Sequence, residues 1–143
     1  MRVSVNISRR ESSDTSTHEC FIDYEDFSEN GHQFCRMNLH SQILGDFSAT
    51  EFDIFECLLR IRKLLEAKGW FVLCKGASVS VYITGMSRNM TGGYILYQKR
   101  LGEDISRKDK VKLFDPATLD EVGTVDEQLA FHQRWVSSIR EIE

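Results

Sequence analysis

The most regular hydrophobic pattern in the chain lies between Ser48 and Gly69. Apolar residues recur there at the spacing of one helix face: Phe52, Phe55, Leu58, Leu59 and Leu65. The opposite face carries the charged residues Asp53, Glu56, Arg60 and Lys63. Ser48 followed by Glu51 predicts a capping box at the start of this helix, and Gly69 predicts a left-handed stop. The pattern therefore predicts an amphipathic helix over residues 48–68.

Alternation of apolar and polar residues predicts strands on both sides of this helix. The expected strands before it are residues 1–8, 19–24 and 33–39, and those after it are 70–74, 78–83, 94–101 and 111–114. Asn30-Gly31 indicates a hairpin turn between the second and third strands. The uninterrupted apolar run 70–74 is typical of a central strand, and residues 40–47 are expected to connect the third strand to the helix.

A second helix is predicted over residues 124–140. Thr124 and Glu127 form its expected capping box, and Phe131, Trp135 and Ile139 form an apolar stripe. Runs of strands separated by short turns favour an antiparallel or mixed sheet over alternating βαβ units. The sequence thus predicts an α+β fold with about six to seven strands packed against two helices (48–68 and 124–140). One domain over residues 1–143 is expected.

The amino-acid composition limits the classes of protein that this chain can represent. The chain is 41% hydrophobic and 28% charged, with a net charge of −4. It has no apolar run long enough for a membrane span and no apolar segment typical of a secretion signal. The four cysteines show no C-x-x-C spacing, which favours reduced thiols and a cytoplasmic location. The net negative charge argues against direct nucleic-acid binding and is compatible with a basic protein partner.

Residues 84–93 are the first candidate for chemistry, because glycines, hydroxyls and a cation are close together there. The loop is expected to contain Gly85, Ser87, Arg88, Thr91, Gly92 and Gly93. Such a loop is able to hold a phosphate or carboxylate against backbone N–H groups and the Arg88 guanidinium. It lacks the Lys-Ser/Thr of a P-loop. The alternatives are a plain hairpin loop, with Met86 and Met90 folded onto the core, and a loop that contacts a partner.

A second candidate is the acidic stretch Asp23, Glu25, Asp26 and Glu29. Its spacing does not fit a calcium-binding loop. Two interpretations are therefore open: an acidic surface that contacts a basic partner, or a solvent-exposed turn. The histidines and cysteines show no metal-ligand spacing, and no nucleophile lies next to a base in sequence. We therefore expect no catalytic residue, no metal and no cofactor, with a small enzyme that uses Arg88 and Cys74 kept as an alternative.

The segments TGMSRNMTGG (84–93) and VDEQLAFHQRW (125–135) resemble short bacterial cytosolic proteins. Some proteins of that kind are immunity proteins for the toxin domains of contact-dependent or polymorphic toxin systems. The resemblance implies a non-catalytic protein that binds a toxin domain, often a basic one, and occludes its active site. On this interpretation the candidate contacts are Asp23, Glu25, Asp26, Glu29 and Arg88. The remaining alternatives are a small ligand- or anion-binding domain at residues 84–93 and a self-associating structural or regulatory subunit.

Overall fold

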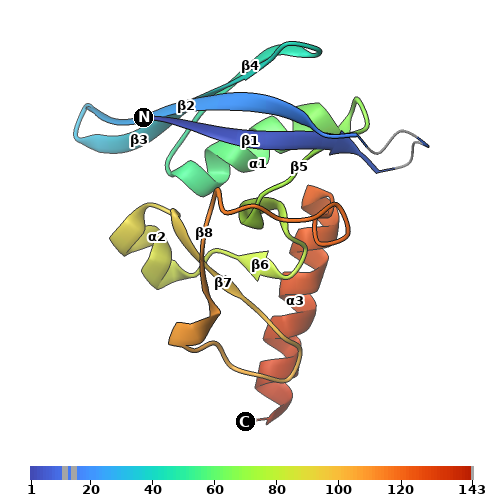
Figure 1. Ribbon diagram of the computed structural model, residues 1–143. Coiled ribbons are helices and arrows are strands. Elements are labelled where there is room, and N and C mark those ends of the chain that lie inside the picture. The colour runs from blue at the N-terminus through green and yellow to red at the C-terminus, as the bar shows by residue number, and fades with distance from the viewer. Residues whose placement is uncertain (11–12, 14–15, 143) are drawn as a thin grey trace.

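The computed structural model describes residues 1–10, 13 and 16–142 and contains two sheets, one above the other in Figure 1. The upper sheet has five strands: β1 (Arg2–Arg9), β2 (His18–Glu29), β3 (His32–Ser41), β4 (Gly45–Glu51) and β5 (Trp70–Val72). The lower sheet has three: β6 (Val81–Tyr82), β7 (Ile95–Gln98) and β8 (Lys110–Lys112). The helices are α1 (Ile54–Glu66), α2 (Gly85–Thr91) and α3 (Val125–Ile142), with short 3-10 turns η1 (Lys75–Ala77) and η2 (Arg107–Asp109). The α+β class is confirmed, with eight strands in two sheets and three helices among the described residues.

The five-stranded sheet is antiparallel throughout, in the order β4-β3-β2-β1-β5. Alternation fixes its two faces: Val5, Ile22 and Met37 are buried on the side of α1, while their sequence neighbours point outward. The β2–β3 hairpin turns at Asn30-Gly31, where both residues have positive φ (52° and 79°), as a two-residue hairpin turn requires. The predicted hairpin is therefore confirmed, and β2 is longer than expected because it continues through the acidic stretch to Glu29.

The start of α1 differs from the sequence prediction. Ser48 lies in β4 opposite Asn38 of β3, so residues 45–51 form a strand where a connector and the first helical turn were expected. The helix begins at Ile54, with Asp53 as its cap: the carboxylate of Asp53 accepts a hydrogen bond from the backbone N–H of Glu56 (2.8 Å). The predicted Ser48–Glu51 capping box is wrong because pairing with β3 satisfies the backbone of this segment. Phe52, expected on the buried face, is 71% exposed.

The segments after α1 also differ in position from the prediction. The apolar run at Trp70 forms β5 at an edge of the sheet beside β1, and not a central strand. Its side chains are buried: Arg9 and His18 lie against the Trp70 ring, and the Arg10 guanidinium lies over the Phe71 ring. Residues 84–93 form the helix α2 in place of the expected loop: the hydroxyl of Thr84 caps it, and Gly92 ends it in the left-handed conformation (φ 64°).

A buried polar cluster joins α1, η1 and α3. The Arg62 guanidinium, only 2% exposed, donates hydrogen bonds to the side-chain oxygen of Gln128 (2.6 Å) and to the carbonyl of Gly123 (2.9 Å). The Gln128 amide in turn donates to the carbonyls of Ser78 (3.0 Å) and Val81 (2.8 Å). These bonds satisfy polar groups that water does not reach. They fix α3, which begins at the confirmed Thr124–Glu127 capping box, against the chain between the two sheets.

One hydrophobic core contains residues of both sheets. Ile7 and Leu39 of the upper sheet belong to the same buried cluster as Val81 and Leu96 of the lower sheet, with Phe55 and Leu58 of α1 between them. All four cysteines are buried and carry free thiols. In the described part of the chain, no helix has both the length and the apolar character needed to cross a membrane.

Candidate functional site

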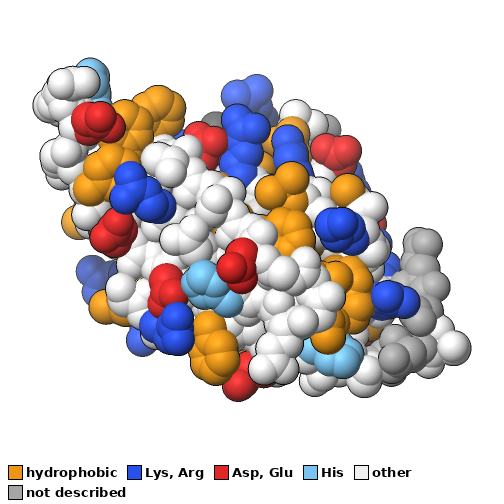
Figure 2. Space-filling view, turned by 90° about the horizontal axis from the view of Figure 1, so that it is seen from above, with side chains coloured by type: hydrophobic (Ala, Val, Ile, Leu, Met, Phe, Trp, Pro, Cys, Tyr) orange, Lys and Arg blue, Asp and Glu red, His pale blue; other side chains and the backbone are white. Residues whose placement is uncertain are grey.

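None of the described helices covers the upper face of the five-stranded sheet (Figure 1). Helix α1 packs on the opposite face, so alternate side chains of β1–β4 point away from α1. We call this surface the outer face. It consists of Arg2, Ser4, Asn6, Glu19, Phe21, Asp23, Glu25, Phe27, Glu29, His32, Phe34, Arg36, Asn38, His40, Asp46, Ser48 and Thr50, followed by Phe52 just beyond β4. Figure 2 shows acidic, basic and hydrophobic side chains interspersed over it.

Three phenylalanines cross the outer face in one row near the β2–β3 turn. The rings of Phe27 and Phe34, which are cross-strand partners, are stacked with centroids 5.5 Å apart, and Phe52 stacks on Phe34 at 5.7 Å. The Arg36 guanidinium lies over the Phe27 ring, 4.5 Å from its centroid. Phe52 is exposed, whereas Phe27 and Phe34 are half-buried beneath their neighbours. Aromatic rings held in this way are typical of interface anchors. The sequence pattern predicted Phe52 on the buried face of a helix, so it did not predict this row.

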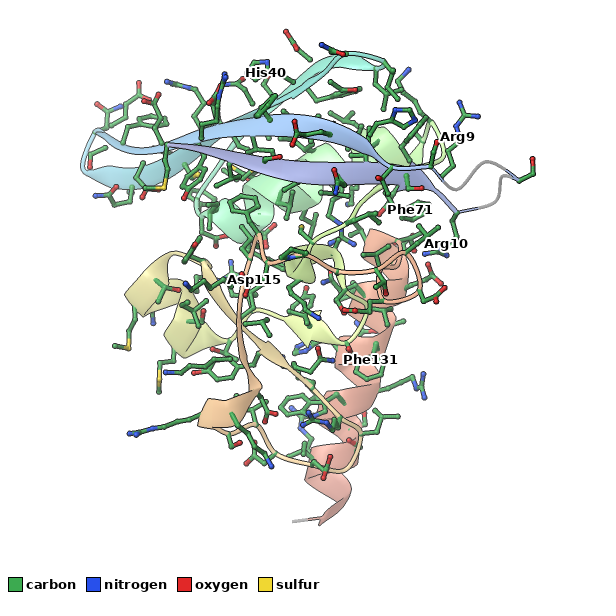
Figure 3. All side chains as sticks on the ribbon, viewed as in Figure 1. Arg9, Arg10, His40, Phe71, Asp115 and Phe131 are labelled. Atoms are coloured by element: carbon green, nitrogen blue, oxygen red, sulfur yellow. The ribbon has the colours of Figure 1, made fainter. Side chains whose placement is uncertain are left out.

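Ion pairs connect the adjacent strands of the outer face. Arg2 donates two hydrogen bonds to the carboxylate of Asp23 (2.7 and 2.8 Å), and this pairing lowers the pKa of Asp23 to about 2. His40 lies between two carboxylates, with Nε2 3.0 Å from Asp23 and Nδ1 3.1 Å from Asp46. Figure 3 shows His40 on the side of the sheet away from α1. Because both ring nitrogens of His40 already contact carboxylates, the arrangement suits an electrostatic surface better than a general base.

The four acidic residues singled out in the sequence do not form one patch. Asp23, Glu25 and Glu29 lie on the outer face, whereas Asp26 is paired with Cys35 and has the opposite orientation. Arg2 neutralises Asp23, and Arg36 neutralises Glu25 at 2.9 Å.

The charge balance of the outer face is nevertheless negative. Its strands carry the carboxylates Glu19, Asp23, Glu25, Glu29 and Asp46 and the guanidinium groups Arg2 and Arg36. Two of these carboxylates pair with the two arginines. The excess negative charge on the described face therefore comes from Glu19, Glu29 and Asp46.

An open depression of about 530 Å³ lies at one end of the outer face. Phe21, His40, Ile43 and Asp46 line it together with His18. Ile43, at the β3–β4 turn, is exposed and separates it from a smaller depression beside Trp70. The two depressions make this end of the sheet uneven, with apolar and charged groups side by side.

The predicted anion-binding residues at 84–93 have other partners. The Arg88 guanidinium lies 3.1 Å from the carboxylate of Asp53 and 3.5 Å from that of Glu56. The hydroxyl of Ser87 donates to the carbonyl of Ile95, and that of Thr91 donates to the carbonyl of Ser87 (2.8 Å).

The glycines of this segment have structural roles as well. Gly85 begins α2, Gly92 ends it, and Gly93 (φ 90°) lies so close to Phe55 that a Cβ at this position would be 2.9 Å from the Phe55 Cβ. An anion at this site would have to displace contacts that hold α2 against α1.

The Cys74 thiol, which the enzyme alternative would use, is buried. Burial raises the pKa of the Cys74 thiol to about 11, which keeps it protonated and poorly nucleophilic. Within the described residues, no group of three or more histidines, cysteines or carboxylates has the geometry of a metal site.

A further cluster, made of titratable and aromatic side chains that the sequence did not place together, lies under α3. Lys99, buried after β7, places Nζ 3.1 Å from Nδ1 of His132 and 4.7 Å from the ring centroid of Trp135. Tyr82 stacks on His132 with centroids 4.2 Å apart. Burial lowers the pKa of Lys99 to about 8. The only signal in the sequence is a lysine inside a strand pattern, which does not reveal its partner on a helix 33 residues away.

No protein-family model matches the chain, and no curated protein matches it.

Proposed function

We propose that this chain is a non-catalytic protein-binding module that covers a basic protein domain with its outer face, in the manner of an immunity protein that occludes a toxin. The observation that carries the proposal is the combination of the stacked Phe27–Phe34–Phe52 row, in which Phe52 is exposed and the other two rings are half-buried, with the excess carboxylates Glu19, Glu29 and Asp46 on the same sheet face. The resemblance of residues 84–93 and 125–135 to small bacterial cytosolic proteins supports the immunity type.

The chemistry of the outer face supports a protein partner over a small ligand. Aromatic anchors surrounded by charged groups are typical of interface centres, where truncation of one ring commonly weakens binding by 2 kcal/mol or more. The contacts of Arg36 with Phe27 and Glu25 hold the row of phenylalanines in place before binding. This lowers the entropy that is lost on association. Glu29 lies beyond Phe27 on the same strand, and Glu19 and Asp46 lie toward the other end of the face. Their negative charge attracts a basic surface and increases the association rate.

The charge pairing within the face changes the expected contacts. Asp23 and Glu25 already interact with arginines, so they fix the surface more than they attract a partner. Glu19, Glu29 and Asp46 are the residues that we expect to contact basic side chains, with Phe52 as the principal apolar anchor.

Affinity capture from the native cytosol tests the proposal. The chain is immobilised through its C-terminus, which lies at the far end of α3 from the outer face (Figure 1). Three proteins are compared: the unaltered chain, Phe52→Ala, and the triple variant Glu19→Gln, Glu29→Gln and Asp46→Asn. A matched control neutralises three exposed carboxylates elsewhere, with Glu103→Gln, Asp104→Asn and Asp120→Asn.

We expect one basic protein to be captured by the unaltered chain and the control, to be released at high salt, and to be lost from both outer-face variants. The purified partner then shows an association rate at least about tenfold lower with the triple variant at low salt. Equal capture by all four proteins, or capture that survives only in the outer-face variants, contradicts the proposal.

A further inference from the structure

The two edges of the five-stranded sheet differ in how they are protected. At one edge, β5 is only three residues long, and the chain that follows it is covered by residues 115–117: the N–H of Ala117 bonds to the carbonyl of Leu73, and that of Lys75 bonds to the carbonyl of Asp115. Figure 3 shows Asp115 below the sheet on this covering segment. A short and covered edge does not recruit another strand.

The other edge is β4, which is seven residues long. Its pairing with β3 runs from Gly45 opposite Ser41 to Glu51 opposite Cys35 with no residue skipped, so no bulge interrupts it. In the part of the chain that the structure describes, β4 forms backbone hydrogen bonds with β3 alone. Its sequence, GDFSATE, contains none of the lysines or prolines that commonly block strand addition.

We infer that β4 is the interface of a symmetric dimer, in which the β4 strands of two copies pair antiparallel and join the two sheets into one. A twofold axis at Ser48 is the register that pairs all seven residues of the strand, because Ser48 is its central residue. The occupant of this edge is a second copy of the chain because the strand is complementary to itself in that register.

Self-complementarity follows from the side chains on each face. On the outer face, Asp46 of one copy lies opposite Thr50 of the other, and Ser48 lies opposite Ser48. On the α1 side, Phe47 lies opposite Ala49, and Glu51 lies opposite Gly45. Large residues meet small ones, and no like charges lie directly opposite each other, which is the arrangement that stabilises cross-strand pairs.

A groove beside β4 offers additional buried surface. It has a volume of about 280 Å³ and lies between residues 48–51 of the strand and the side of α1 that carries Arg60, Lys63 and Leu64. Leu64 is 47% exposed and contributes apolar area to the wall of this groove. In the proposed register, Phe47 of the second copy lies opposite Ala49 and on the same side of the sheet as this groove, so it covers the apolar wall.

The dimer is independent of the proposed partner binding. Pairing through β4 leaves both outer faces exposed and places them side by side on one extended sheet. Failure of the dimer would leave the outer face of a single copy intact, and failure to capture a partner would leave the β4 edge unchanged. The two proposals are therefore tested separately.

Sedimentation of the purified chain tests the dimer, with two lysine substitutions on the exposed side of β4. Ser48→Lys places two cations opposite each other at the twofold axis, whereas Thr50→Lys places each cation opposite Asp46 of the other copy. We expect the unaltered chain and Thr50→Lys to show dimer mass between about 10 µM and about 1 mM, and Ser48→Lys to remain a monomer over the same range. Far-UV circular dichroism establishes that both variants are folded.

Cysteine cross-linking tests the register. Ser48→Cys places two thiols opposite each other, so oxidation by dissolved oxygen should form a disulfide-linked dimer. Thr50→Cys separates its two thiols by four residues along the strands, about 13 Å, and should not cross-link. A monomeric unaltered chain at the highest concentration, equal association of both lysine variants, or equal cross-linking of both cysteine variants overturns the inference.

Discussion

The ammonium group of Lys99 lies 3.1 Å from Nδ1 of His132, under α3 and beside the rings of Tyr82 and Trp135. The side chain of Lys99 is only 2% exposed. Burial lowers the pKa of Lys99 to about 8, and burial together with the Lys99 charge lowers the pKa of His132 to about 4. The contact between α3 and the lower sheet is therefore most stable when Lys99 and His132 are both neutral.

Lys99→Met should make the protein more stable at pH 7. The unfolded chain binds the Lys99 proton up to about pH 10.4, whereas the folded chain releases it near pH 8, so the lysine destabilises the fold below that range by up to about 3 kcal/mol. As pH rises from 8 to 10, this disadvantage disappears, and the stability difference between the variant and the unaltered chain should shrink. Urea unfolding at pH 7, 9 and 10 measures this difference. Lys112→Met, on the exposed side of β8, is the matched control and should change the free energy of unfolding at pH 7 by less than about 0.5 kcal/mol.

His132 should remain neutral until strongly acidic pH. An NMR titration of its imidazole should give a pKa near 4, below the value of about 6.5 for an unperturbed histidine. Because the folded pKa is lowered, the unfolded chain takes up the proton first, and the contribution of His132 to stability is lost as pH falls from about 6.5 to 4. In Lys99→Met the His132 pKa should rise because one of its two causes is removed. An unchanged value would show that the Lys99 charge does not act on His132.

The contact between Arg62 and Gln128 should be among the most sensitive in the fold. Gln128→Leu removes the acceptor of a buried guanidinium and leaves the carbonyls of Ser78 and Val81 without the amide that bonds to them. We expect a loss of about 3 kcal/mol in the free energy of unfolding, measured by urea titration. Gln133→Leu, on the exposed side of the same helix, should change it by less than about 0.5 kcal/mol. Equal effects of both changes would contradict the role assigned to Gln128.

The two candidate caps of α1 predict opposite outcomes. Asp53→Ala removes the acceptor for the Glu56 N–H and the partner of Arg88, so it should lower the free energy of unfolding by about 1–2 kcal/mol. Ser48→Ala changes an exposed strand residue and should have an effect below about 0.5 kcal/mol. Asp53→Asn keeps a capping oxygen and should fall between the two. A larger effect at Ser48 than at Asp53 would restore the predicted capping box.

Sequence alone determined the features that depend on near neighbours along the chain. Alternation over residues 33–39 correctly predicted the strand β3, and Asn30-Gly31 correctly predicted the hairpin. The Thr124–Glu127 box located the start of α3, because its hydrogen bonds link residues only three positions apart. Each of these patterns depends on residues that are close together in the sequence, and the tertiary structure keeps the local conformation that each pattern predicts.

The tertiary structure decided the features that depend on distant residues. Ser48–Glu51 has the local pattern of a cap, but hydrogen bonding to β3 makes it a strand and moves the start of α1 to Ile54. Residues 84–93 have loop composition, yet the Thr84 cap and the Arg88–Asp53 pair support a short helix. The row of Phe27, Phe34 and Phe52 and the contact between Lys99 and His132 exist only because separate elements meet. The free energy of such contacts depends on which elements become neighbours, and local sequence patterns do not contain that information.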